Sequence, residues 1–189
     1  MSIQKQQTGA LTRRQTLQAL AGPVLVGLIG VLAGARPARA DNQDPARARV
    51  LLSVTGAISR TNAADGTRRY DFDTEMFDAL PTRTVRTGTP WHQGTLAFSG
   101  PLLADVLAHV GASGSTLQMT ALNDYQVRMP ANEVLPHQPI LARRVDGAVL
   151  SVRDKGPLFL IFPFDDLPQT RNDLFYSRSI WQLKAIEVR

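Results

Sequence analysis

The side chains best suited to catalysis are sparse in this chain. The three histidines, His92, His109 and His137, have no spacing typical of metal ligands. There is no cysteine, which excludes thiolate nucleophiles, iron–sulfur clusters and cysteine-bound metals. No glycine-rich phosphate loop or serine nucleophile elbow occurs. The motifs therefore favour binding over catalysis, and a metal site would require distant residues to converge.

Three segments carry residue types that suit a ligand. Trp91 lies in a polar loop between Pro90 and Gly94, and Asn123-Asp124-Tyr125 places a polar bend beside an aromatic ring. In Arg153-Asp154-Lys155-Gly156-Pro157, cations flank a corner whose backbone N–H groups can hold an anionic or carbonyl-rich ligand. Each segment also has a structural interpretation: a tryptophan at the core edge, an Asn-Asp turn and a solvated loop.

Five segments, in this order along the chain, resemble the molybdopterin-binding domain of the sulfite oxidase family. They are Phe98–Leu107, Ala121–Val127, Ile140–Ala142 with Asp146-Gly147, Lys155–Leu158 and Arg178–Leu183. The resemblance covers roughly residues 49–189. It implies an α+β fold, mostly β mixed sheets with few helices, of the sulfite-oxidase-like type.

One departure from that family changes the chemistry that the resemblance implies. Catalytic members hold molybdenum through a cysteine shortly before the segment matching Phe98-Ser99-Gly100, and Thr84–Trp91 occupies that region here. A hydroxyl is a weaker ligand than a thiolate, so we expect no molybdenum and no oxo-transfer catalysis. The chain also resembles the exported, cysteine-less pterin-binding proteins of the PruR type. This implies a periplasmic protein that senses reduced pterins and acts on the periplasmic domain of a membrane cyclic-di-GMP enzyme.

The resemblance also implies which groups would meet a pterin. A carboxylate can accept from both N3–H and the 2-amino group, and Asp124 is the expected acceptor, assisted by Asn123. Trp91 or Tyr125 would supply the aromatic face.

Donors are needed for the carbonyl edge and the ring nitrogens of the pterin. We expect them from Arg153, Lys155 or Arg178, and Trp181 would either line the pocket or pack in the core. Two other functions stay open: a molybdopterin-dependent oxidoreductase subunit with an oxygen ligand or none, and an interaction module with a vestigial pocket.

Hydrophobic periodicity and turn signals predict the elements that position these residues. Helices are expected over Thr74–Leu80, capped by Asp73 and stopped by Pro81, and from a Ser99 cap, with Pro101 just inside, to Gly111. The expected strands are Arg49–Thr55, Thr82–Thr87, Thr116–Leu122, Tyr125–Met129, Pro139–Val145, Ala148–Val152, the buried Leu158–Pro163 and Ser179–Val188. Asp146-Gly147 is a strong hairpin signal.

Residues 1–40 are predicted to be an export signal peptide. Basic residues precede an apolar run over Ala19–Ala35, and Ala38-Arg39-Ala40 has the small residues that signal peptidase reads. Thr12–Gln18 resembles the twin-arginine signal, with Thr16 in place of the preferred Phe. An uncleaved helix and the general secretory route are the alternatives. Residues 41–48 would then be a flexible leader to one domain over residues 49–189, located in the periplasm.

The basic charge of the chain belongs to that predicted signal. Residues 1–40 hold five of the 21 basic residues and none of the 16 acidic ones, so residues 41–189 are balanced at 16 of each sign. A basic stripe with interleaved aromatics is absent from the sequence, so we expect no nucleic-acid partner.

Overall fold

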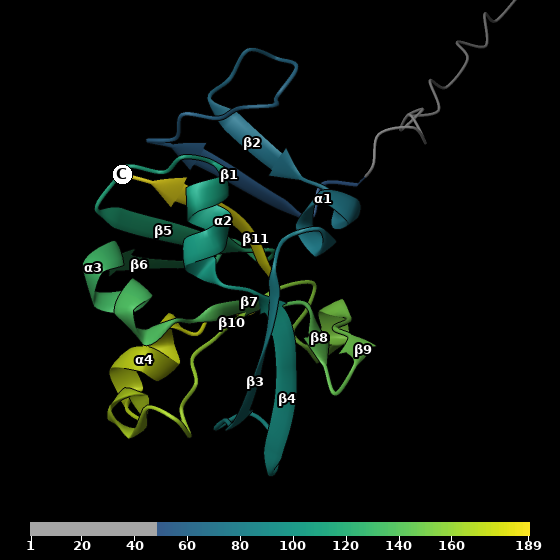
Figure 1. Ribbon diagram of the computed structural model, residues 1–189, viewed down its shortest axis with the longest axis vertical. Helices are drawn as coiled ribbons and strands as arrows, with labels where there is room; N and C mark the ends of the chain where they lie inside the picture. The colour runs from purple at the N-terminus through teal and green to yellow at the C-terminus, as the bar shows by residue number, and fades with distance from the viewer. Residues whose placement is uncertain (1–48) are drawn as a thin grey trace, which may run out of the picture. The chain divides into compact units, whose positions relative to one another are not determined.

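The computed structural model describes residues 49–189 (Figure 1). The predictions for the signal peptide and the leader fall outside these residues. The described part is a mixed α+β structure in which strands form three sheets and the α-helices are short. This agrees with the α+β class, mostly β with few helices, predicted from the sequence. Within residues 49–189, no helix combines the length and apolarity that a membrane crossing requires.

The largest sheet has five strands in the order β2-β1-β11-β5-β6. The strands are β1 (Leu52–Gly56), β2 (Arg69–Phe72), β5 (Thr116–Ala121), β6 (Gln126–Pro130) and β11 (Leu183–Val188). The β1–β11 pair is parallel and the other pairs are antiparallel. Alternate residues such as Leu117 and Met119 are buried, so one face of the sheet packs on the core.

The other two sheets are smaller. β7 (Ile140–Ala142) pairs with β10 (Phe159–Ile161), and every residue of both strands is buried. β3 (Thr82–Gly88), β4 (Thr95–Pro101), β8 (Arg144–Val145) and β9 (Ala148–Val149) form the third sheet in that order. The β3–β4 hairpin extends away from the five-stranded sheet (Figure 1). Asp146 and Gly147 both have positive φ, as the predicted hairpin turn requires.

Four short α-helices surround these sheets. They are α1 (Thr74–Asp78), α2 (Leu103–His109), α3 (Ala131–Val134) and α4 (Asp173–Arg178). The predicted cap of α1 is present, because the Asp73 carboxylate accepts from the backbone N–H of Met76 at 2.8 Å. Short 3₁₀ turns lie at Leu135–His137 (η1), Val152–Asp154 (η2) and Pro168–Thr170 (η3).

The predicted start of α2 was wrong. Ser99 and Pro101 belong to β4, and α2 begins at Leu103 with Leu102 at its N-cap and no side-chain capping bond. The Ser99 hydroxyl instead lies 2.9 Å from that of Thr84 across the β3–β4 pair. A Ser-Gly-Pro sequence suits a helix start locally, but pairing with β3 and β8 takes these residues into the sheet.

Several boundaries and elements also differ from the prediction. The last strand begins at Leu183 rather than Ser179, and the residues after β9 form η2 rather than a longer strand. β2, the first half of β4, α3 and α4 had no predicted counterpart. β2, α3 and α4 have only four to six residues, too few for a periodic pattern to stand out in the sequence.

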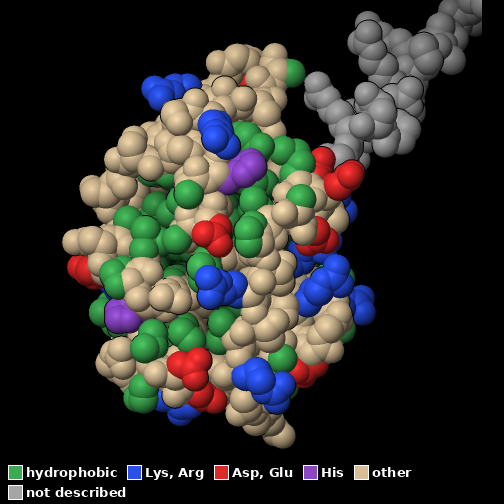
Figure 2. Space-filling view, viewed as in Figure 1, with side chains coloured by type: hydrophobic (Ala, Val, Ile, Leu, Met, Phe, Trp, Pro, Cys, Tyr) green, Lys and Arg blue, Asp and Glu red, His purple; other side chains and the backbone are tan. Residues whose placement is uncertain are grey.

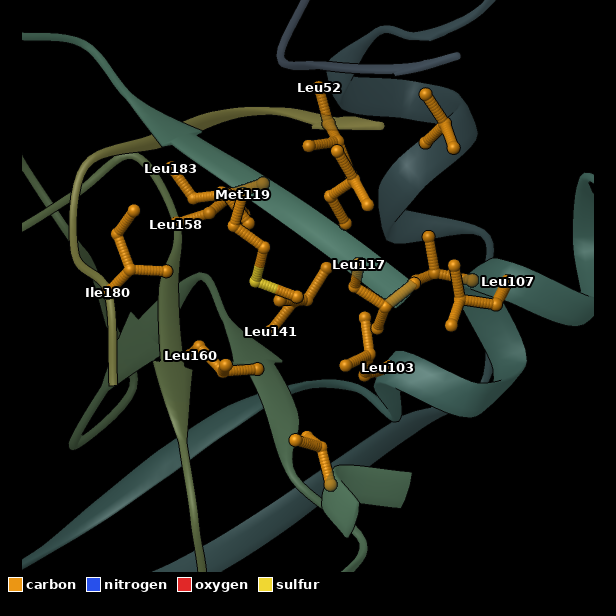
Figure 3. Close-up of a cluster of buried hydrophobic side chains, with 14 of the residues drawn as sticks. Leu52, Leu103, Leu107, Leu117, Met119, Leu141, Leu158, Leu160, Ile180 and Leu183 are labelled. Carbon is orange, nitrogen blue, oxygen red and sulfur yellow. The ribbon is translucent and has the colours of Figure 1, made fainter. Parts of the chain in front are cut away.

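The core lies mainly between the five-stranded sheet, α2 and the β7–β10 pair. Figure 3 shows Leu117 and Met119 of the sheet, Leu103 and Leu107 of α2, and Leu141 of β7 pointing into one cluster. A second cluster under the β3–β4 hairpin contains Phe98, Ile140, Phe159 and Ile161. On the face in Figure 2, basic and acidic side chains are interspersed.

Candidate functional site

The aromatic pocket, as we call it here, has a volume of about 480 Å³. It forms where the β5–β6 bend, the end of α4 and the segment before β11 meet the tip of the β3–β4 hairpin. Four of its lining residues are aromatic: Trp91, Tyr125, Tyr176 and Trp181. The others are Ala121, Asn123, Ser177, Ser179 and Ile180.

Trp91 is at the centre of the aromatic cluster. Its ring centroid lies 5.7 Å from Trp181 and 6.0 Å from Tyr176, both close to edge-on. It also lies 5.5 Å from Phe159, which is fully buried. Edge-to-face packing of this kind holds rings in defined orientations. Tyr125 and Trp181 remain exposed, so their rings are accessible to a ligand.

Hydrogen bonds hold the hairpin tip that carries Trp91. The Asp165 carboxylate accepts from the backbone N–H of Gly88 at 3.0 Å and pairs with Arg171. These contacts lower the pKa of Asp165 below its ordinary value, and the hydrogen bond from Gly88 makes the largest contribution. Within the loop, Thr89 Oγ1 and His92 Nδ1 are 2.9 Å apart. Asp165 therefore anchors the loop at Gly88, and the contact between Thr89 and His92 closes the turn around Trp91.

The β5–β6 bend positions Asn123 and Tyr125. Asn123 Oδ1 accepts from the backbone N–H of Tyr125 at 3.2 Å, and Asp124 N–H donates to the Ala121 carbonyl at 3.0 Å. Asp124 has a φ of 64°, a left-handed conformation that Asp and Asn tolerate better than most residues. This turn places Asn123 and Tyr125 on the pocket and directs Asp124 elsewhere.

The eight residues predicted to contact a ligand therefore separate into two groups. Trp91, Asn123, Tyr125 and Trp181 line the aromatic pocket. Asp124 does not: its carboxylate accepts from Lys184 Nζ at 2.6 Å, and its side chain is 82 % exposed. The left-handed turn at Asp124 points this carboxylate to solvent and not into the pocket.

The three predicted cationic donors are also outside the pocket lining. Arg153 is exposed on η2. Lys155 Nζ lies 5.8 Å from the centroid of the Trp181 ring, so it contacts the aromatic cluster rather than the cavity. Arg178 is buried and donates to Glu133 at 2.6 Å. A buried guanidinium with a carboxylate partner joins α4 to α3 and is not available to a ligand.

Sequence reasoning missed the contribution of α4. Tyr176 and Ser177 line the pocket, and α4 starts at a capping bond from the N–H of Phe175 to Asn172 Oδ1. Asn172-Asp173 is a recognisable helix-start signal. It could have located the helix, although not the pocket that the helix borders.

The electrostatics of the pocket are close to neutral. No Asp, Glu, Lys or Arg is among its lining residues. Nearby, burial and, to a smaller extent, the Lys155 ammonium lower the pKa of His92 below its ordinary value of 6.5. In residues 49–189, no three His, Asp or Glu side chains come close enough together to hold a metal ion. The pocket is thus suited to a flat, uncharged aromatic ring.

The function of the pocket is inferred from its geometry, because two comparisons with known proteins found no match. No protein-family model matches the chain, and no curated protein matches it significantly.

Proposed function

We propose that this protein is a non-catalytic binding protein for a pterin, with a reduced pterin as its signal. The observation that carries the proposal is the aromatic pocket, in which Trp91, Tyr125, Tyr176 and Trp181 surround a cavity of about 480 Å³. Typical small-molecule sites have volumes in this range and are lined mainly by apolar and aromatic side chains. Stacking contributes about 0.5–1.5 kcal/mol beyond the burial of area.

Asn123 is the polar side chain that fits the edge of a pterin. Its carboxamide oxygen retains a lone pair beside the Tyr125 bond, and Nδ2 has no hydrogen-bond partner in the described residues. The oxygen can accept from the 2-amino group or N3–H, and the nitrogen can donate to the ring carbonyl. We therefore transfer to Asn123 the role that the resemblance suggested for Asp124.

Molybdenum fits the residues of this chain poorly. The hydroxyls in the region that the resemblance assigns to the metal ligand are already engaged. Thr84 pairs with Ser99, Thr87 is buried and accepts from the N–H of Asp165, and Thr89 pairs with His92. Oxygen ligation would require one of these contacts to break. This supports binding without oxo-transfer.

The biological setting follows from the resemblance and the predicted signal peptide. We infer that the protein acts in the periplasm and passes the presence of a reduced pterin to the periplasmic domain of a membrane cyclic-di-GMP enzyme.

Calorimetric titration with a tetrahydropterin tests the proposal. Trp181→Ala should weaken binding about tenfold, since 1.4 kcal/mol is one decade in affinity. Val149→Ala, at an exposed position on β9, is the matched control and should bind normally. Failure of the unmodified protein to bind would favour the vestigial pocket. About one molybdenum per chain by elemental analysis would revive the oxidoreductase.

A further inference from the structure

A second hollow of about 580 Å³ lies beside β1 and β11, and we call it the apolar groove. Its apolar lining residues are Val50, Leu51, Leu122, Val152, Pro157 and Ala185, and its charged ones are Arg49 and Lys184. Val50, Leu122 and Val152 are 49 %, 42 % and 52 % exposed. Three large aliphatic side chains open to solvent around one hollow are typical of an interaction site.

The lining of the apolar groove indicates what kind of occupant fits. None of its lining residues is aromatic, so a flat heterocycle would find no ring to stack on. Both charged lining residues are cations: Lys184 pairs with Asp124 at 2.6 Å, whereas no carboxylate lies within 4.0 Å of Arg49 in the described part of the chain. A segment with apolar side chains and an acidic side chain would complement both features.

Two other occupants fit less well. A second copy docked groove to groove by two-fold symmetry would offer Arg49 no acidic side chain from the groove lining, which contains no Asp or Glu. A membrane surface would meet a hollow, whereas side chains that insert into lipid must project from the protein. We propose that the apolar groove is a docking site for a segment of a partner protein that carries apolar and acidic side chains.

The apolar groove and the aromatic pocket share a wall. Leu122 lines the groove, while its neighbours Ala121 and Asn123 line the pocket. Gln182 bonds to two residues that line the groove. Its carbonyl accepts from the N–H of Leu122 at 2.8 Å, and its Nε2 donates to the Val152 carbonyl at 2.8 Å.

Gln182 directly follows Trp181 of the pocket. A ligand that shifts Trp181 would therefore move both groove residues, so ligand and partner should influence each other. This coupling, unlike the docking, rests on the proposed function.

Selection of random twelve-residue peptides on phage tests the docking. Purified residues 41–189 are the target, with Leu122→Asp as the counter-target, and selected peptides are then synthesised for titration. We expect peptides that contain apolar residues and Asp or Glu, with affinity at least tenfold lower for Leu122→Asp. Leu174→Asp, at an exposed leucine on α4, should bind them normally. Arg49→Glu should weaken them, and this loss should shrink at high salt.

Three results would overturn the docking. They are no enrichment, equal binding to Leu122→Asp, or Leu122-dependent cosedimentation with phosphatidylglycerol vesicles in place of peptide binding. The coupling predicts that a tetrahydropterin changes peptide affinity and that the peptide changes pterin affinity by the same factor. Unchanged affinities refute the coupling alone. If the protein binds no pterin, the proposed function fails while the peptide selection still decides the docking.

Discussion

Of the eight side chains predicted to contact a ligand, Asn123 is the one non-aromatic residue that lines the aromatic pocket. We expect Asn123→Ala to weaken tetrahydropterin binding about tenfold, because polar groups of the bound ring would lose their partner. Asp124→Ala should change affinity less than threefold, since this carboxylate is exposed and pairs with Lys184. Calorimetric titration of both variants checks the assignment. The reverse order of effects would restore Asp124 as the recognition residue.

The single residue His92 should make the stability of the folded protein depend on pH. Its pKa in the folded protein lies below 6.5, so the unfolded chain binds more protons between that lowered value and 6.5. Stability should therefore fall as the pH drops through this window. Lys155→Met should raise the pKa of His92 toward 6.5 without reaching it, because burial remains. An NMR titration of the His92 ring measures both, and a midpoint at or above 6.5 in the unmodified protein would contradict the expectation.

At the scale of the elements, Asp165 joins the β3–β4 hairpin to the segment after β10. It accepts from Gly88 on β3 at 3.0 Å and pairs with Arg171. Asp165→Ala should release the hairpin tip and misplace Trp91, lowering ligand affinity more than it lowers the melting temperature. Asp146→Ala, which removes a bond to Ala97 at the other edge of β4, is a matched control. Hydrogen exchange should increase at the hairpin tip in Asp165→Ala alone; equal exchange in both variants would remove the proposed role.

At the scale of the whole described domain, β7 connects the two hydrophobic clusters. Leu141 belongs to the cluster of the five-stranded sheet, while Ile140 and Ala142 belong to the cluster under the hairpin. Gly100 of β4 packs directly on the Leu141 carbonyl, where a Cβ would overlap it. Gly100→Ala should destabilise the protein by about 1–3 kcal/mol in denaturant unfolding. Gly88→Ala is the control, because its Cβ would meet nothing nearer than 3.7 Å. Equal stability of the two variants would show that β4 and β7 can separate without cost.

Export is a prediction about the whole chain. If the protein is exported, its mature sequence should begin at Asp41 in N-terminal sequencing, since the signal-peptidase pattern ends at Ala40. Replacing Arg13 and Arg14 with lysine should abolish export if the twin-arginine route is used. Normal export of that variant would indicate the general secretory route, and a mature form that retains both arginines would contradict cleavage.

The sequence predicted the elements that are determined by interactions between residues close together in the chain. Asp73 caps α1 because its carboxylate reaches an N–H three residues ahead, and Asp146-Gly147 turns because both residues tolerate positive φ. The polar bend at Asn123-Asp124 helped to predict the strand Thr116–Leu122, which contains β5, and the apolar run Leu158–Pro163 predicted β10. The absence of cysteine excludes thiolate chemistry from composition alone, because no folding can supply a missing side chain.

Tertiary structure alone decided the start of α2 and the membership of the pocket. Ser99 and Pro101 suit a helix start, but the cross-strand bonds to β3 outweigh that local preference. Trp91, Asn123 and the pair Tyr176 and Trp181 come from three segments far apart in sequence, and long-range packing brings them together. Sequence reasoning proposed Asn123 and Asp124 together as ligand contacts. The left-handed turn at Asp124 determines that Asn123 faces the aromatic pocket and Asp124 faces solvent, because the backbone dihedrals set the direction of each side chain.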